Sequence, residues 1–137
     1  MRMLGAVLIA LLSCGCQTQL FAPRSLHLWA QRELAQATTF PYTTSKRVIL
    51  GHRLAHNFTL QASDADHVVI DCGNGLRLKV KDPQYATTWA TITFQDADCD
   101  GYDDLRFTAT FQDDAPPINV IFRFHPTEWE QFILPIH

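Results

Sequence analysis

The sequence predicts an all-β fold, an antiparallel β-sandwich or flattened barrel of seven to eight strands. From Lys46 onward, apolar and polar residues alternate with the two-residue period of half-buried strands. Turn-forming residues interrupt this alternation every eight to twelve residues or so, the spacing typical of sandwiches and small barrels. The dipeptide Asn74-Gly75 between two apolar runs is a strong hairpin signal.

The expected strands follow one another with short connections. In the strand after Asn74-Gly75, for example, the apolar side chains at 76, 78 and 80 face the core, and the basic ones between them face water. The strands are expected at residues 47–50, 58–61, 67–72, 76–81, 89–95, 105–111 and 118–124, with a last apolar segment at 129–134.

Residues 1–45 are expected to lie outside the folded β-domain and to connect it to the membrane. Residues 1–13 have a short basic start followed by an uncharged apolar run, as secretory signals do. Residues 14–45 are assigned to a tether, in which residues 26–35 can form a short amphipathic helix beginning after Ser25. The β-domain is then expected to cover residues 46–137.

The end of the signal looks like a bacterial lipobox. Leu11-Leu12-Ser13 precedes Cys14, which would become the lipidated first residue of the mature protein. Cys16 is the second choice for lipidation, and an ordinary cleaved signal with free secretion is the alternative. Gly15, with no Asp at that position, is associated through this resemblance with sorting to the outer membrane. The expected location is therefore the bacterial cell envelope, facing the periplasm.

An acidic loop between two expected strands predicts a Ca²⁺ site. Its ligands follow the spacing of calcium loops, with side chains at positions one, three, five and nine, a glycine (Gly101) at six and a carbonyl at seven. The predicted ligands are Asp96, Asp98, Asp100, Tyr102 and Asp104. Phe107 replaces the twelfth-position Glu of an EF-hand. The residues on both sides of the loop alternate with the two-residue period of strands, so the predicted site is a loop between two strands and not between two helices. An acidic turn without metal is the alternative.

Two cysteines fall inside the expected β-domain. An oxidising periplasm would permit a disulfide between Cys72 and Cys99, which would tie the turn after one strand to the acidic loop. Two separate buried or half-buried thiols are the alternative.

The net charge of −3 hides an asymmetry between the halves of the chain. Residues 24–81 contain eight Lys and Arg against four Asp and Glu, whereas residues 82–137 contain two against ten. The acidic half is suited to a cation or a basic partner. The basic residues are few and scattered, which argues against nucleic acid. No Ser/His/Asp or Cys/His set occurs in a setting that favours nucleophilic catalysis, so no enzyme is expected, although a small Asp-dependent hydrolase stays open.

The lipobox, the β pattern and the segment ITFQDADCDGYDDLRF together resemble the periplasmic immunity lipoproteins that neutralise peptidoglycan hydrolases delivered by antibacterial type IV secretion systems. Their fold is similar to that of the i-type lysozyme inhibitors. The resemblance is close over residues 96–105 and loose over 47–137, and it implies calcium at Asp96, Asp98, Asp100 and Asp104.

The function implied by this resemblance is inhibition. A rigid loop would enter the hydrolase cleft and offer its catalytic carboxylates a hydrogen-bond donor. The inhibitory loop has no motif that can be matched, and Tyr85 and His137 are the candidate contacts. The alternative is a structural calcium-binding envelope lipoprotein without inhibitory activity.

Overall fold

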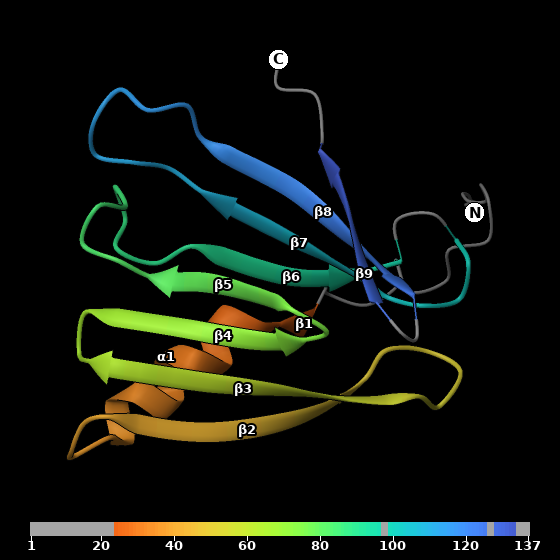
Figure 1. Cartoon of the computed structure of the whole chain (residues 1–137), viewed down its shortest axis with the longest axis horizontal. Helices are drawn as coiled ribbons and strands as arrows, with labels where there is room; N and C mark the ends of the chain where they lie inside the picture. Colours follow the sequence, from red (N-terminus) through yellow and green to blue (C-terminus); the bar gives the residue numbers. More distant parts are fainter. Residues whose placement is uncertain (1–23, 97–98, 126–127, 134–137) are drawn as a thin grey trace, which may run out of the picture.

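The computed structural model describes residues 24–96, 99–125 and 128–133, which form two antiparallel sheets and one helix (Figure 1). One sheet has the order β2-β3-β4-β5, formed by β2 (Tyr42–Ile49), β3 (Ala55–Asp64), β4 (His67–Gly73) and β5 (Leu76–Lys81). The other has the order β1-β6-β7-β8-β9, formed by β1 (Arg24–Ser25), β6 (Thr91–Gln95), β7 (Asp104–Ala109), β8 (Ile118–His125) and β9 (Glu128–Ile133). The all-β sandwich expected from the sequence is therefore confirmed.

The two sheets approach each other where β5 leads into β6. The backbone N–H of Ala90 donates to the carbonyl of Val80 at 2.8 Å, and Lys81 and Trp89 form an isolated antiparallel bridge. A second link comes from β9, where the indole N–H of Trp129 donates to the carbonyl of Cys72 on β4 at 3.0 Å. These links join the two sheets of the sandwich.

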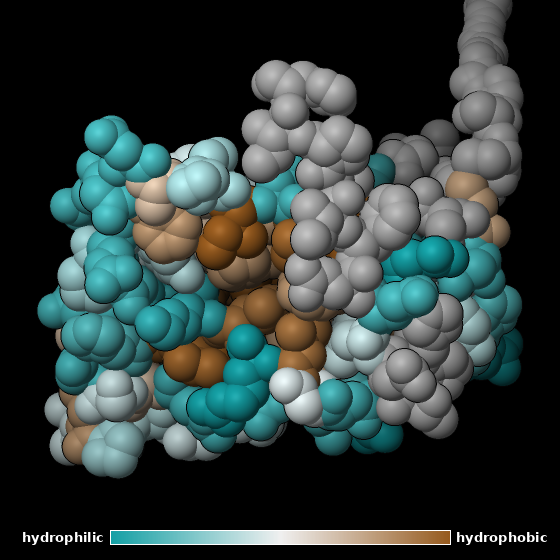
Figure 2. All heavy atoms as spheres, turned by 45° about the horizontal axis from the view of Figure 1, so that its top comes forward, coloured by the Kyte–Doolittle hydropathy of each residue, from teal (hydrophilic) through white to brown (hydrophobic). Residues whose placement is uncertain are grey.

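The core lies between the sheets and follows the alternation of the strands. Phe58 and Leu60 on β3, Ile70 on β4 and Ile92 on β6 are fully buried, while their chain neighbours point outward. Truncating such a residue to Ala typically costs 2–5 kcal/mol, because the cavity only partly collapses. On the face drawn in Figure 2, hydrophobic side chains gather in a hollow, with hydrophilic ones to its left and below it.

Helix α1 (Leu26–Gln36) is part of the folded domain. Its buried residues Leu26, Trp29 and Ala30 have the i, i+3, i+4 spacing of one helix face, and they belong to the same core cluster as the strands. Ser25 occupies the N-cap position, as the sequence predicts, but its side chain makes no capping hydrogen bond. Its hydroxyl lies 3.0 Å from Nδ1 of His27 instead.

The folded domain begins before Lys46. Residues 24–45, which the sequence analysis assigns to the tether, contain β1, α1 and the first half of β2. Strand β2 pairs with β3 over its full length, from Tyr42 opposite Ala62 to Ile49 opposite Ala55. The signal segment 1–13 and the proposed lipidation sites Cys14 and Cys16 lie outside the described residues. Within the described ranges, no helix is long and apolar enough to cross a membrane.

Candidate functional site

The acidic loop connects β6 to β7 and folds back on its first residue. Asp96 is buried, and its two carboxylate oxygens accept the backbone N–H groups of Asp100 at 3.2 Å and of Gly101 at 2.9 Å. Gly101 has a φ of +91°, the left-handed conformation that glycine adopts without a steric penalty. Asp96, at the first position of the calcium-loop pattern, therefore holds Asp100 and Gly101, at its fifth and sixth positions, close to the start of the loop.

The other end of the loop is also anchored by a buried carboxylate. Asp104 is 1 % exposed, and its Oδ1 accepts the backbone N–H of Phe124 on β8 at 2.9 Å. Asp100 is exposed, and its Oδ1 accepts the N–H of Tyr102 at 2.9 Å. Buried carboxylates need compensation by hydrogen bonds or by a cation, and the backbone N–H groups supply part of it.

The described ligand positions fit a calcium ion in chemistry and order, because all of them offer oxygen, which Ca²⁺ prefers. Among the described residues, no group of three or more His, Cys, Asp or Glu side chains is gathered closely enough to hold a metal ion. Asp98, the third position of the loop, lies outside the described residues. The calcium site therefore stays a prediction.

A second loop, the turn between β2 and β3, packs directly on the acidic loop. The backbone N–H of Asp103 donates to the carbonyl of Leu50 at 2.8 Å. A Cβ added to Gly51 would lie only 2.0 Å from the carbonyl oxygen of Gly101, so the two backbones are in close contact. The rings of His52 and Tyr102 are 4.5 Å apart between centroids. In sequence, Gly51 looks like an ordinary turn glycine, so nothing local indicates this contact.

Aromatic rings connect the two loops to both sheets. Tyr102 contacts Phe124 on β8 at 5.8 Å between ring centroids, and Phe124 contacts Trp129 on β9 at 4.9 Å. His56 on β3 lies edge-on to both Phe124 and Trp129, and its Nε2 bonds the carbonyl of Cys72. Offset and edge-to-face ring pairs add about 0.5–1.5 kcal/mol each beyond the burial of their area.

The two cysteines of the β-domain are not bonded to each other, so the predicted Cys72–Cys99 disulfide is wrong. Cys72 is a free, fully buried thiol on β4. Its burial, and secondarily the charge of Asp71, raise its pKa to about 12. Cys99 is disulfide-bonded, and its partner lies outside the described residues. The alternation of β4 explains the difference, because it directs Cys72 into the core alongside Ile70.

The predicted inhibitory contact Tyr85 is not presented at the surface. Its side chain is 4 % exposed, its hydroxyl donates to the carbonyl of Lys79 at 2.9 Å, and its ring packs against Phe111. Desolvation, and secondarily the charge of Asp82, raise the pKa of the Tyr85 hydroxyl. It is a core residue that joins the two sheets. The other candidate contact, His137, lies outside the described residues.

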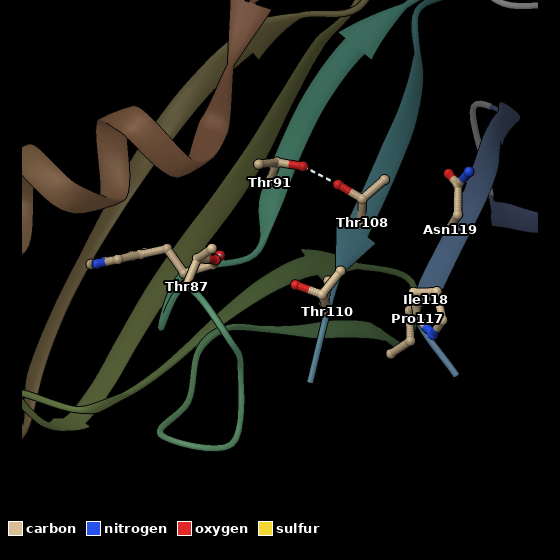
Figure 3. A pocket seen from close by; sticks show the side chains of 9 residues that line it. Thr87, Thr91, Thr108, Thr110, Pro117, Ile118 and Asn119 are labelled. Carbon is tan, nitrogen blue, oxygen red and sulfur yellow. Dashed lines mark hydrogen bonds between the residues drawn. The ribbon is translucent and has the colours of Figure 1, made fainter. Parts of the chain in front are cut away.

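A shallow groove of about 370 Å³ runs across the outer side of β6, β7 and β8. In Figure 3, the Thr91 and Thr108 hydroxyls point toward each other across neighbouring strands and are hydrogen-bonded. Asn119 follows in the same row on β8, and its Oδ1 is buried without a partner among the described residues. The lining consists of threonines, Trp89, Asn119 and small apolar residues, so the groove holds no acid or base for catalysis.

No family model matches the chain, and neither the curated proteins nor the solved structures contain a significant match.

Proposed function

We propose that the protein is a lipid-anchored periplasmic inhibitor that blocks a lysozyme-like peptidoglycan hydrolase by occluding its cleft. The observation that carries this proposal is the pair of interlocked loops, in which the acidic loop and the β2–β3 turn fix each other through the bond from Asp103 to Leu50 and the contact of Gly51 with Gly101. A loop that is already ordered loses little entropy when it binds, which is what an inhibitor needs to compete with a polymeric substrate.

Calcium is part of the proposal. We expect Asp96, Asp98, Asp100, Asp104 and the carbonyl of Tyr102 to hold one Ca²⁺ ion, with Asp96 and Asp104 as its buried ligands. The ion would supply positive charge to two carboxylates that are otherwise buried near the ends of one loop. Its role is mechanical and electrostatic, because it would stiffen the loop and neutralise its charge.

The proposed location and partner follow from the N-terminus and from the chemistry of glycan hydrolysis. Lipidation at Cys14, with Cys16 as the alternative, would hold the domain at the outer membrane facing the periplasm, where peptidoglycan hydrolases act. Such hydrolases carry two carboxyl groups in a cleft. An inhibitor stops them by filling that cleft and giving these carboxyl groups fixed hydrogen-bond partners.

A protection assay tests this function in cells. Bacteria that receive a peptidoglycan hydrolase in the periplasm are compared with and without this protein, and lysis is followed by turbidity. We expect protection by the wild-type chain and weaker protection when residues 1–13 are replaced by a signal that is cleaved without lipidation, because the domain is then no longer anchored while both Cys14 and Cys16 are kept. Absence of protection, together with no retention of any hydrolase on the immobilised domain, would contradict the proposal and favour a structural envelope lipoprotein.

A further inference from the structure

The turn between β2 and β3 has an unusual backbone. The N–H of Leu54 donates to the carbonyl of Gly51 at 2.8 Å, which closes a four-residue turn with His52 and Arg53 at its centre. Their φ angles are 49° and 59°, so both adopt the left-handed conformation that normally requires Gly or Asn. A sequence optimised only for stability would place Asn-Gly here, as it does at Asn74-Gly75. Strained residues of this kind are concentrated at functional sites.

The surroundings hold this turn in place from the opposite sheet. The contacts are the hydrogen bond from Asp103 to Leu50, the tight approach of Gly51 to Gly101, and the packing of the His52 ring on Tyr102. The turn and the acidic loop lie at the same end of the sandwich (Figure 1). The tip is therefore fixed before any partner arrives.

The two side chains at the tip are hydrogen-bonding groups, and Arg53 adds a positive charge. His52 and Arg53 are both exposed. Among the residues that the structure describes, the guanidinium of Arg53 forms no ion pair. Arg presents five N–H donors in a planar fork that matches a carboxylate, and it stays charged at all relevant pH values. Its fork is thus available to a carboxylate of a partner.

We infer that the β2–β3 turn is the element that enters the hydrolase cleft, with Arg53 and His52 contacting the catalytic carboxyl groups. This inference rests on the proposed function and replaces Tyr85, which is buried, as the contact residue. The partner surface is defined by its chemistry, a cleft with a pair of carboxyl groups. Charge complementarity favours this fit, because the cationic tip meets an acidic cleft.

The acidic loop beside the tip makes the fit depend on calcium. Without a cation, the carboxylates of the loop would stand next to the tip and repel those of the cleft. Bound calcium removes this repulsion and also stiffens the loop that supports Gly51 and His52. Both effects act in the same direction, so calcium is expected to tighten inhibition.

The test uses the purified full-length mature chain and a panel of purified hydrolases: muramidases of the c, g and i types, and any hydrolase encoded by a gene adjacent to this one. Inhibition is measured by the release of dye from labelled peptidoglycan in calcium buffer. Against a hydrolase that the wild type inhibits, Arg53→Ala is expected to weaken inhibition by roughly a hundredfold. Arg53→Lys, which keeps the charge but loses the fork, should weaken it by roughly tenfold.

Two further variants separate binding from folding. Arg53→Gly relieves the backbone strain, so its melting temperature is expected to equal or exceed that of the wild type while its inhibition is lost. Arg32→Ala removes an exposed arginine from α1 and is the matched control, with unchanged inhibition. Inhibition by the wild type that survives both Arg53→Ala and His52→Ala would overturn this inference alone. No inhibition of any hydrolase by the wild type would overturn the proposed function and the inference with it.

Discussion

At the scale of single residues, the contact of Gly51 with Gly101 is the most sensitive point of the molecule. Gly51 has a φ of +110° and no space for a Cβ. Gly51→Ala is therefore expected to lower the free energy of unfolding by about 2–4 kcal/mol, from steric overlap and backbone strain together. Urea denaturation measures this loss.

Gly75→Ala provides the matched control for this prediction. Gly75 has a φ of +87°, but a Cβ added there meets no atom within 4 Å. Only the conformational penalty remains, so a loss of about 1 kcal/mol is expected. Equal losses for the two variants would show that the two loops do not press on each other.

Cys72 and Cys99 are expected to differ in their chemistry. Because the pKa of the Cys72 thiol is raised to about 12, iodoacetamide should label it only after unfolding. An unfolded thiol ionises near pH 9, so the stabilisation linked to this shift is complete below that pH and is lost as the pH rises toward 12. Non-reducing peptide mapping should join Cys99 to a peptide containing Cys14 or Cys16. A Cys72–Cys99 peptide would contradict the structure.

At the scale of elements, helix α1 is expected to contribute to the stability of the β-domain. Trp29 is 6 % exposed within the core cluster, so Trp29→Ala should cost about 3–5 kcal/mol. Leu28 lies on the same helix but is 47 % exposed, and Leu28→Ala should change stability by no more than about 0.5 kcal/mol. Thermal or urea unfolding compares them, and equal effects would mean that the helix does not pack on the sheets.

The sequence predicts the strands well where local alternation determines them. The strand expected at residues 76–81 coincides with β5, because Asn74-Gly75 and Asp82-Pro83 delimit it on both sides. The first half of β2 escapes prediction, since Tyr42–Ser45 is rich in hydroxyls and becomes a strand only by pairing with β3. Local pattern cannot reveal such a long-range partner.

The candidate site is predictable only in part, for the same reason. The spacing of Asp96, Asp100 and Asp104 indicates the acidic loop from sequence alone. The packing of the β2–β3 turn on that loop joins residues about fifty positions apart, and no local signal encodes it. The Cys72–Cys99 disulfide and the exposure of Tyr85 are predicted wrongly for the same reason. Both depend on the direction in which a side chain points in the assembled sandwich.

At the scale of the whole molecule, calcium is expected to raise thermal stability. A ligand that binds only the folded state stabilises it by about 2.7 kcal/mol at a hundred times its dissociation constant. An excess of chelator should therefore lower the melting temperature of the wild type. Asp98→Ala should melt at the lower temperature with or without calcium, whereas Asp113→Ala, at an exposed position in another turn, should keep the calcium response. Identical wild-type melts in both buffers would contradict the calcium site.

The most direct test of the account is the calcium dependence of inhibition. The wild-type domain is titrated against a peptidoglycan hydrolase in calcium buffer and again in an excess of chelator, and the inhibition constant is measured in each. The account predicts inhibition in calcium that weakens at least roughly tenfold when the ion is removed, a loss of about 1.4 kcal/mol. Equal inhibition in the two buffers would contradict the claim that calcium holds the acidic loop and, through it, the β2–β3 turn.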